Sequence, residues 1–194
     1  MSRLDLWLRE YQQRQQQTWS ALPLEAVARL VERLRAVLEA EGQVFVFGNG
    51  GSAANASHFA TDLGKGASDR LARRFRVLSL TDNTPWMTAL GNDYSFDDVF
   101  VRQLQNYARP GDLALALSVS GQSPNVVRAV RWAREHGLYT AALVGGQRGA
   151  LADLAELTIV IPDTHYGRVE DAQMTICHML AYAFMEGATG AALG

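Results

Sequence analysis

The sequence predicts one α/β domain built around a five-stranded parallel sheet, with helices on both faces to give three layers. Five short apolar segments recur along the chain, and helix-like stretches separate them. Strands covered on both faces are expected to be apolar throughout, and strands that alternate with helices form a parallel sheet with right-handed crossovers. At 194 residues, the chain is long enough for one such domain with a full core, residues 1–194.

Residues 1–41 carry two predicted helices and no strand. Apolar residues occur at roughly helical spacing in the Gln-rich stretch 3–20, which predicts an amphipathic helix there. A second helix is expected to begin at Pro23 and to end at Gly42. Its apolar stripe is Ala26, Leu30, Leu34 and Leu38. Because neither helix follows a strand, the pair is expected to pack as an appendage, either on the core (residues 42–194) or on another subunit.

The α/β core contains the five strands and a long closing helix. The predicted strands are 44–47, 76–80, 113–117, 140–144 and 157–161. The predicted helical stretches are 53–65, 95–108, 125–136, 148–155 and 169–185. No repeat, low-complexity segment or linker interrupts this pattern, which supports a single domain.

The composition is that of an ordinary globular protein, with 48% hydrophobic and 20% charged residues, so disorder and coiled coil are poor interpretations. Lys and Arg number 18 and Asp and Glu 20, a balance that does not indicate direct binding of nucleic acid. The single cysteine, Cys177, excludes an intrachain disulfide framework. No signal core and no apolar run near the roughly 20 residues of a membrane span is found. We expect a soluble, cytoplasmic protein.

A glycine-rich loop follows the first strand, at the strand end where open α/β sheets bind ligands. It reads Gly48-Asn49-Gly50-Gly51-Ser52, and its glycines let the backbone approach a ligand. We expect the next helix to begin at Ser52, where free N–H groups and the helix dipole attract an anion, and we count Ser52 among the substrate-binding residues. The loop matches neither a dinucleotide fingerprint nor a Walker A loop. The alternative is a tight turn with Ser52 as an ordinary N-cap.

A second polar loop follows the third strand. It reads Ser118-Val119-Ser120-Gly121-Gln122-Ser123-Pro124-Asn125. Pro124 suits the first helical position, so Ser123 is the expected N-cap. Three serines and the N–H groups of a helix N-terminus can donate to the oxygens of one phosphate. The alternative is a polar cap with spare serines, but two such loops at equivalent strand ends favour a phosphate site.

Two histidines and several acids are candidate metal ligands. His58 and Asp62 are four residues apart, which puts both on one helix face, and imidazole with carboxylate is an ordinary zinc-binding pair. Glu170 and His178 are eight residues apart, a rise of roughly 12 Å, so both reach one ion only if Glu170 bends inward. The alternative for His58 and Asp62 is a solvated pair on the helix surface, and the alternative for His178 is a core histidine.

Asn92 and Asp93 follow Gly91 at an expected helix-to-helix junction. They form either a plain capping turn or a site for sugar hydroxyls. Asp82 and Asn83, after the second strand, have the same two interpretations.

Four motifs, taken together and in order, resemble the phosphoheptose isomerases of the sugar isomerase (SIS) domain class. They are FGNGGSAANASHFATDL, GND, SVSGQSPNV and RVEDAQMTICHML. The similarity covers most of the chain, including the two N-terminal helices. The motifs are more specific for the SIS fold than for the substrate.

The resemblance implies a flavodoxin-like strand order and a homotetramer with active sites between subunits, bundled by the N-terminal helices. It implies Zn²⁺ and isomerisation of sedoheptulose 7-phosphate to a heptose 7-phosphate. By matching position, the implied phosphate loop is Ser118, Val119, Ser120 and Ser123. The implied sugar contacts are Asn49, Gly50, Gly51, Asn92 and Asp93. The implied metal ligands are His58, Asp62, Glu170 and His178.

Three positions depart from the family pattern. The family usually has Glu, its catalytic base, at position 62, usually has Gln at position 170, and often has Thr at position 119. A carboxylate one methylene shorter reaches less far, and a small misplacement costs about a hundredfold in rate. We therefore hypothesise that Asp62 is mainly a metal ligand and that Glu170 transfers the proton, with His178 as a ligand that also serves as acid. Val119, in place of Thr, lacks a hydroxyl group that could donate to the phosphate.

A non-catalytic interpretation is the main alternative. SIS domains also serve as sugar-phosphate sensors, and a related DnaA initiator-associating protein is a tetrameric interaction partner that lacks the matching metal histidines. This chain has both His58 and His178, which favours a metal-dependent aldose–ketose isomerase. Another sugar phosphate as substrate is a second alternative.

Overall fold

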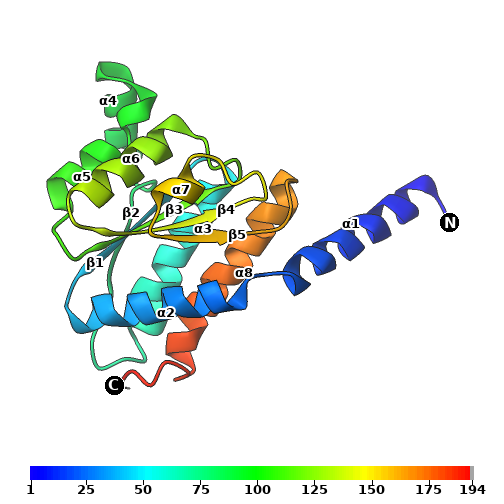
Figure 1. Ribbon diagram of the computed structural model, residues 1–194, viewed down its shortest axis with the longest axis horizontal. Coiled ribbons are helices and arrows are strands. Elements are labelled where there is room, and N and C mark those ends of the chain that lie inside the picture. Colours follow the sequence, from blue (N-terminus) through cyan, green and yellow to red (C-terminus); the bar gives the residue numbers. More distant parts are fainter. Residues whose placement is uncertain (193–194) are drawn as a thin grey trace.

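A computed structural model describes residues 1–192 and has the predicted three layers (Figure 1). Its sheet has five parallel strands in the flavodoxin-like order β2-β1-β3-β4-β5. The strands are β1 (Gln43–Gly48), β2 (Arg76–Ser79), β3 (Leu113–Ser118), β4 (Tyr139–Val144) and β5 (Leu157–Val160). Every predicted strand is confirmed to within one residue at each end, because each is a short apolar run. Every residue of β3 is buried, and in β1 and β4 every residue after the first is buried.

Helices cover both faces of the sheet (Figure 1). One face carries α2 (Leu24–Glu39), α3 (Gly51–Thr61) and α8 (Tyr166–Met185). The other face carries α5 (Val101–Tyr107), α6 (Pro124–Glu135) and the short α7 (Leu151–Leu154). Each face has its own apolar cluster, so the sheet separates two halves of one core.

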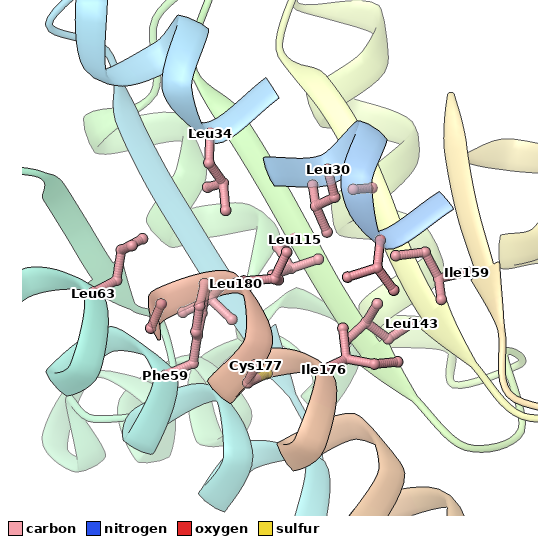
Figure 2. Close-up of a cluster of buried hydrophobic side chains, with 14 of the residues drawn as sticks. Leu30, Leu34, Phe59, Leu63, Leu115, Leu143, Ile159, Ile176, Cys177 and Leu180 are labelled. Carbon is pink, nitrogen blue, oxygen red and sulfur yellow. The ribbon is translucent and has the colours of Figure 1, made fainter. Parts of the chain in front are cut away.

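The larger apolar cluster fixes α3 and α8 against the sheet and against each other (Figure 2). Phe59 of α3 and Leu180 of α8 are both fully buried there, together with Leu115 of β3. Burying a large apolar side chain contributes about 1.5–3 kcal/mol. The packing therefore holds rigidly the two helices that carry His58, Glu170 and His178.

The N-terminal helix α1 (Arg3–Ser20) has the predicted bounds and extends away from the domain (Figure 1). Its start is fixed by a capping box, in which the Ser2 hydroxyl accepts from the Asp5 N–H and the Asp5 carboxylate accepts from the Ser2 N–H. Large apolar side chains on it are exposed: Leu4, Leu6, Trp7 and Leu8. The next helix begins at Leu24, with Pro23 as its N-cap rather than its first residue. Within residues 1–192, no helix is long and apolar enough to cross a membrane.

Four helical segments differ from the prediction. The helix expected over 148–155 forms only over Leu151–Leu154. The helix expected over 53–65 is α3 followed by a π-helix, Asp62–Ala67, which begins at a candidate ligand. The helix expected over 95–108 is a short 3₁₀ turn, Phe96–Asp98, and then α5. A helix α4 (Thr84–Asp93) precedes them, and its bounds were not predicted because only Leu90 in it is buried, so the apolar periodicity is weak.

A partly buried ion pair ties α1 to the start of α8. The Asp163 carboxylate accepts hydrogen bonds from Arg168 Nε (2.6 Å) and Nη2 (2.9 Å) and from the Thr18 hydroxyl (2.8 Å). The Arg168 guanidinium lowers the pKa of Asp163 far below its usual range, and backbone N–H groups and Thr18 lower it further against the opposing effect of burial. The pair anchors the first turn of α8, which carries Tyr166 of the candidate site and leads directly into Glu170.

Replacing Asp163 by asparagine is expected to destabilise the fold by about 3 kcal/mol at pH 7, because Arg168 loses its partner. The folded-state pKa of Asp163 lies below the unfolded value, so the contribution is complete above about pH 5 and declines as the pH falls below about 4. Urea unfolding at pH 7 and pH 3 measures it. The exposed Asp153→Asn is the control. If the free energies of unfolding of wild type and Asp163→Asn differed by the same amount at both pH values, this account would be contradicted.

Candidate functional site

The two predicted polar loops meet in one small cavity of about 70 Å³ at the carboxyl ends of β1 and β3. Its lining, called here the serine pocket, is Asn49, Ser52, Ser118, Val119, Ser120, Ser123, Tyr166 and Glu170. The structure thus brings together the predicted phosphate loop, two residues of the glycine-rich loop and one acid of α8.

The serine loop turns tightly over this cavity. The Ser118 hydroxyl oxygen accepts from the Gly121 N–H at 3.1 Å, and the Ser120 hydroxyl oxygen accepts from the Gln122 N–H at 3.2 Å. Ser123 is the N-cap of α6 and Pro124 its first residue, as predicted. Gly121 has φ of +66°, and a Cβ there would lie 2.1 Å from the Arg148 carbonyl oxygen, so only glycine fits.

Two asparagines join the glycine-rich loop to the serine loop. Asn49 Nδ2 donates to Asn125 Oδ1 and Asn125 Nδ2 donates to Asn49 Oδ1, each at 2.9 Å. The side chain of Asn125 is buried. The reciprocal pair fixes the two loops relative to each other.

The structure corrects the role of Ser52 at the helix start. The N-cap of α3 is Gly50, with φ of +56°, and the helix begins at Gly51. Ser52 lies inside the first turn, is buried, and donates its hydroxyl proton to Gln173 Oε1 at 3.0 Å. The N-cap alternative for Ser52 is therefore wrong, since no side chain caps α3.

Glu170 lies in the serine pocket, directly against Gly51. A Cβ on Gly51 would meet the Glu170 carboxylate at 2.3–2.5 Å, so the absence of a side chain makes room for it. Burial raises the pKa of Glu170, and the charge of Asp171 raises it further. It is the only carboxylate that lines this pocket among residues 1–192.

The candidate metal ligands His58, Asp62 and His178 converge on one point, called here the His–Asp cluster. Asp62 Oδ2 lies 3.4 Å from His58 Nε2 and 3.7 Å from His178 Nε2. One ligand atom from each residue lies within 4.8 Å of the others. Both imidazoles are about half exposed, with side chains 51% and 43% accessible. The core-histidine interpretation of His178 is therefore wrong.

The chemistry of the His–Asp cluster fits a divalent cation. Asp62 Oδ2 is buried and has no hydrogen-bond partner among the described residues, and such an acceptor costs about 1–3 kcal/mol when left unpaired. Ligand atoms around a tetrahedral zinc, with bonds of roughly 2.0–2.1 Å, lie roughly 3.4 Å apart. The two distances from Asp62 Oδ2, 3.4 and 3.7 Å, are close to this value. Three protein ligands leave a position open, as catalytic zinc sites do.

Not every predicted site residue joins these two groups. Glu170 is outside the His–Asp cluster, because eight residues of α8 separate it from His178, a rise of roughly 12 Å. Asn92 and Asp93 are exposed at the end of α4, bonded to each other, and α4 projects from the opposite side of the sheet (Figure 1). Within one chain they contact neither group.

Sequence reasoning missed two polar residues that support the site. Asn125 was read only as part of the loop, and Gln173 was not singled out. Gln173 is fully buried and bonded to Ser52 and to the Leu143 carbonyl. A polar residue between Ala172 and Met174 in an apolar helix is the only signal that pointed to it.

The SIS domain family model matches residues 7–145, so the chain belongs to the SIS domain class. Its flavodoxin-like sheet and the hydroxyl-lined pocket at the carboxyl edge agree with this class. The chain belongs, within that class, to the phosphoheptose isomerase family. A phosphoheptose isomerase of Rhodospirillum rubrum is 40% identical over 156 residues, covering 80% of this chain and 82% of that protein. One of Mycobacterium tuberculosis is 40% identical over 159 residues, covering 81% and 80%.

Solved structures agree with this assignment. Phosphoheptose isomerase of Neisseria gonorrhoeae superposes with a TM-score of 0.86 at 27% identity, covering 95% of this chain and all of that chain. The enzyme of Francisella tularensis has a TM-score of 0.85 at 28% identity, covering 96% of this chain and all of that chain. The fold resemblance stated from the motifs is thereby confirmed.

Proposed function

We propose that this protein is a metal-dependent aldose–ketose isomerase that converts sedoheptulose 7-phosphate to a heptose 7-phosphate. The relatives named phosphoheptose isomerase support the reaction and the substrate. The observation that carries the proposal is the order of the two groups along α3 and α8. These helices contribute Ser52 and Glu170 to the serine pocket, and His58 and His178 of the His–Asp cluster lie roughly two turns further along them.

The serine pocket binds the phosphate of the substrate. The hydroxyl oxygens of Ser118 and Ser120 accept from backbone N–H groups, so their protons are free to donate to phosphate oxygens. The N-terminus of α6 adds its free N–H groups and its dipole. Binding the remote phosphate positions the reacting end of the sugar.

Glu170 is the base that moves the proton between the two reacting carbons. Isomerisation removes a proton from the carbon beside the carbonyl and returns one to the neighbouring carbon through an enediol. Glu170 is the carboxylate that lines the pocket, and burial raises its pKa. A base whose pKa lies nearer the working pH transfers protons more effectively.

His58, Asp62 and His178 would hold the metal, for which we propose Zn²⁺. A divalent cation bound there supplies a Lewis acid that polarises the carbonyl and hydroxyl oxygens of the substrate. The residues themselves contribute the buried charge of Asp62 and two imidazole nitrogens aimed at it. This assignment makes Asp62 a ligand rather than the base.

We further propose a homotetramer. The exposed apolar side chains of α1 and its extension away from the domain support burial of this helix against other subunits (Figure 1). Within one chain, the serine pocket and the His–Asp cluster are separated by roughly 10 Å of α3. We propose that a neighbouring subunit completes each active site. This arrangement would bridge the separation between the two groups and would place Asn92 and Asp93 in the active site of a neighbour.

Turnover of a panel of phosphorylated ketoses, with and without chelation, tests the function. We expect sedoheptulose 7-phosphate to be converted, the rate to fall on chelation, and zinc to restore it. Binding of the sugar phosphate with no turnover in any metal state would identify a sensor instead.

Replacing Gly51 by alanine is expected to lower kcat by up to about a hundredfold, because the new Cβ displaces the Glu170 carboxylate. The fold should tolerate the change, since Gly51 is helical and the group that must move is the end of a flexible side chain. Steady-state kinetics and thermal unfolding measure both effects. Ala36→Ser, which adds one heavy atom at an exposed position of α2, is the control. An unchanged kcat for Gly51→Ala would contradict the position assigned to Glu170.

A further inference from the structure

The hydrogen bonds of Gln173 determine which way the Ser52 hydroxyl points. Gln173 lies on α8, fully buried, and its Nε2 donates to the Leu143 carbonyl oxygen at 3.2 Å. A backbone carbonyl only accepts, so the amide group cannot be flipped without losing this bond. Gln173 Oε1 is therefore directed at Ser52.

Ser52 must in turn donate its proton to that oxygen. The distance from Ser52 Oγ to Gln173 Oε1 is 3.0 Å, and a hydroxyl has one proton and two lone pairs. With the proton used inside the protein, Ser52 offers the serine pocket lone pairs only. It cannot also donate to a phosphate oxygen.

The serines of the opposite loop have the reverse polarity. Ser118 and Ser120 accept from the backbone and keep their protons. The serine pocket thus has a donating side, formed by the loop after β3, and an accepting side, formed by the hydroxyl oxygen of Ser52. A phosphate satisfies the donating side, and a hydroxyl group satisfies the accepting side.

We propose that Ser52 binds a hydroxyl of the sugar next to the phosphate, and that Gln173 is the positioning residue that keeps Ser52 an acceptor. This inference rests on the proposed function, since it assumes a sugar phosphate as ligand. It assigns the pair a role in specificity: they favour a phosphate ester that carries a neighbouring hydroxyl over phosphate alone.

Equilibrium binding of two probes, sedoheptulose 7-phosphate and inorganic phosphate, tests the proposal by calorimetry on the metal-loaded protein. Ser52→Ala is expected to weaken binding of the sugar phosphate about 3- to 10-fold, which corresponds to one lost hydrogen bond. The affinity for inorganic phosphate should not change. Gln173→Met is expected to lower the ratio of the two affinities by a similar factor, because the freed Ser52 hydroxyl can then donate to phosphate. Gln173→Glu, held protonated by its full burial, keeps an oxygen toward Ser52 and an O–H toward the Leu143 carbonyl, and it should retain the ratio.

The control for lost buried hydrogen bonds is Gln103→Met. Gln103 is also buried and donates to two backbone carbonyls, but it lies outside the serine pocket. Gln103→Met should lower the stability of the protein without changing the ratio of the two affinities. If Gln173→Met does not fold, Ser52→Ala and Gln173→Glu decide the question alone.

If Ser52→Ala weakened the binding of both probes equally, the inference would be overturned, because Ser52 would then donate a hydrogen bond to the phosphate. A ratio unchanged in both Ser52→Ala and Gln173→Met would overturn it as well. A wild-type protein that binds inorganic phosphate and no sugar phosphate would overturn the proposed function instead, so the two failures are distinguishable.

Discussion

Glu170→Gln is expected to lower kcat for sedoheptulose 7-phosphate by a factor of about 10² to 10⁴, with KM little changed. The variant keeps the size and the pocket contacts of the side chain and removes its capacity to take a proton. A large loss here would assign the base to position 170 rather than to position 62. Steady-state kinetics on the zinc-loaded protein measure the effect.

The control for Glu170→Gln is Glu186→Gln, at the exposed end of the same helix, which should leave kcat unchanged. Thermal unfolding should show that Glu170→Gln is as stable as wild type or more so, because a neutral amide is less costly to bury than a carboxylate. Wild-type kcat in Glu170→Gln would refute the role of Glu170 and return that of base to Asp62.

Asp62→Asn is expected to weaken zinc binding by about a hundredfold or more, and turnover should fall with it. The amide removes the negative charge that strengthens binding of a divalent cation, and it keeps the volume of the side chain. In the metal-free protein, the same change relieves a buried acceptor that has no partner within residues 1–192. Its metal-free melting temperature should therefore equal or exceed that of wild type.

The measurement for Asp62→Asn is the rise in melting temperature on adding zinc, with direct determination of bound metal. Wild type should be stabilised, as binding to the folded state requires, and Asp62→Asn should not. Asp69→Asn, an exposed acid just after the π-helix, should behave as wild type. A zinc-dependent rise in Asp62→Asn equal to that of wild type would remove Asp62 from the ligand set.

The strands and most helices were predictable because burial controls their sequence. The runs at Val44–Phe47 and Leu113–Leu117 are apolar throughout and lie between helices on both faces. The spacing of His58 and Asp62 likewise predicted a shared helix face, and His178 was placed beside them through the resemblance. These features follow from local pattern and from motifs in order.

The remaining features depend on tertiary contacts that no local pattern shows. The end of α3 changes to a π-helix where Gly64 and Gly66 pack closely against Val77 and Met185. Glu170 points at Gly51 rather than along α8 because that glycine leaves space. The polarity of Ser52 depends on Gln173, which is 121 residues away in the chain.

The central claim is that this chain moves a proton between adjacent carbons of a sugar phosphate. The most direct measurement is NMR of sedoheptulose 7-phosphate incubated with zinc-loaded protein in deuterated water. We expect an aldose phosphate to accumulate with solvent deuterium on the carbon beside its new carbonyl, and chelation to stop the exchange. A ligand that binds yet gains neither deuterium nor an aldehyde form, at any metal loading, would contradict the account.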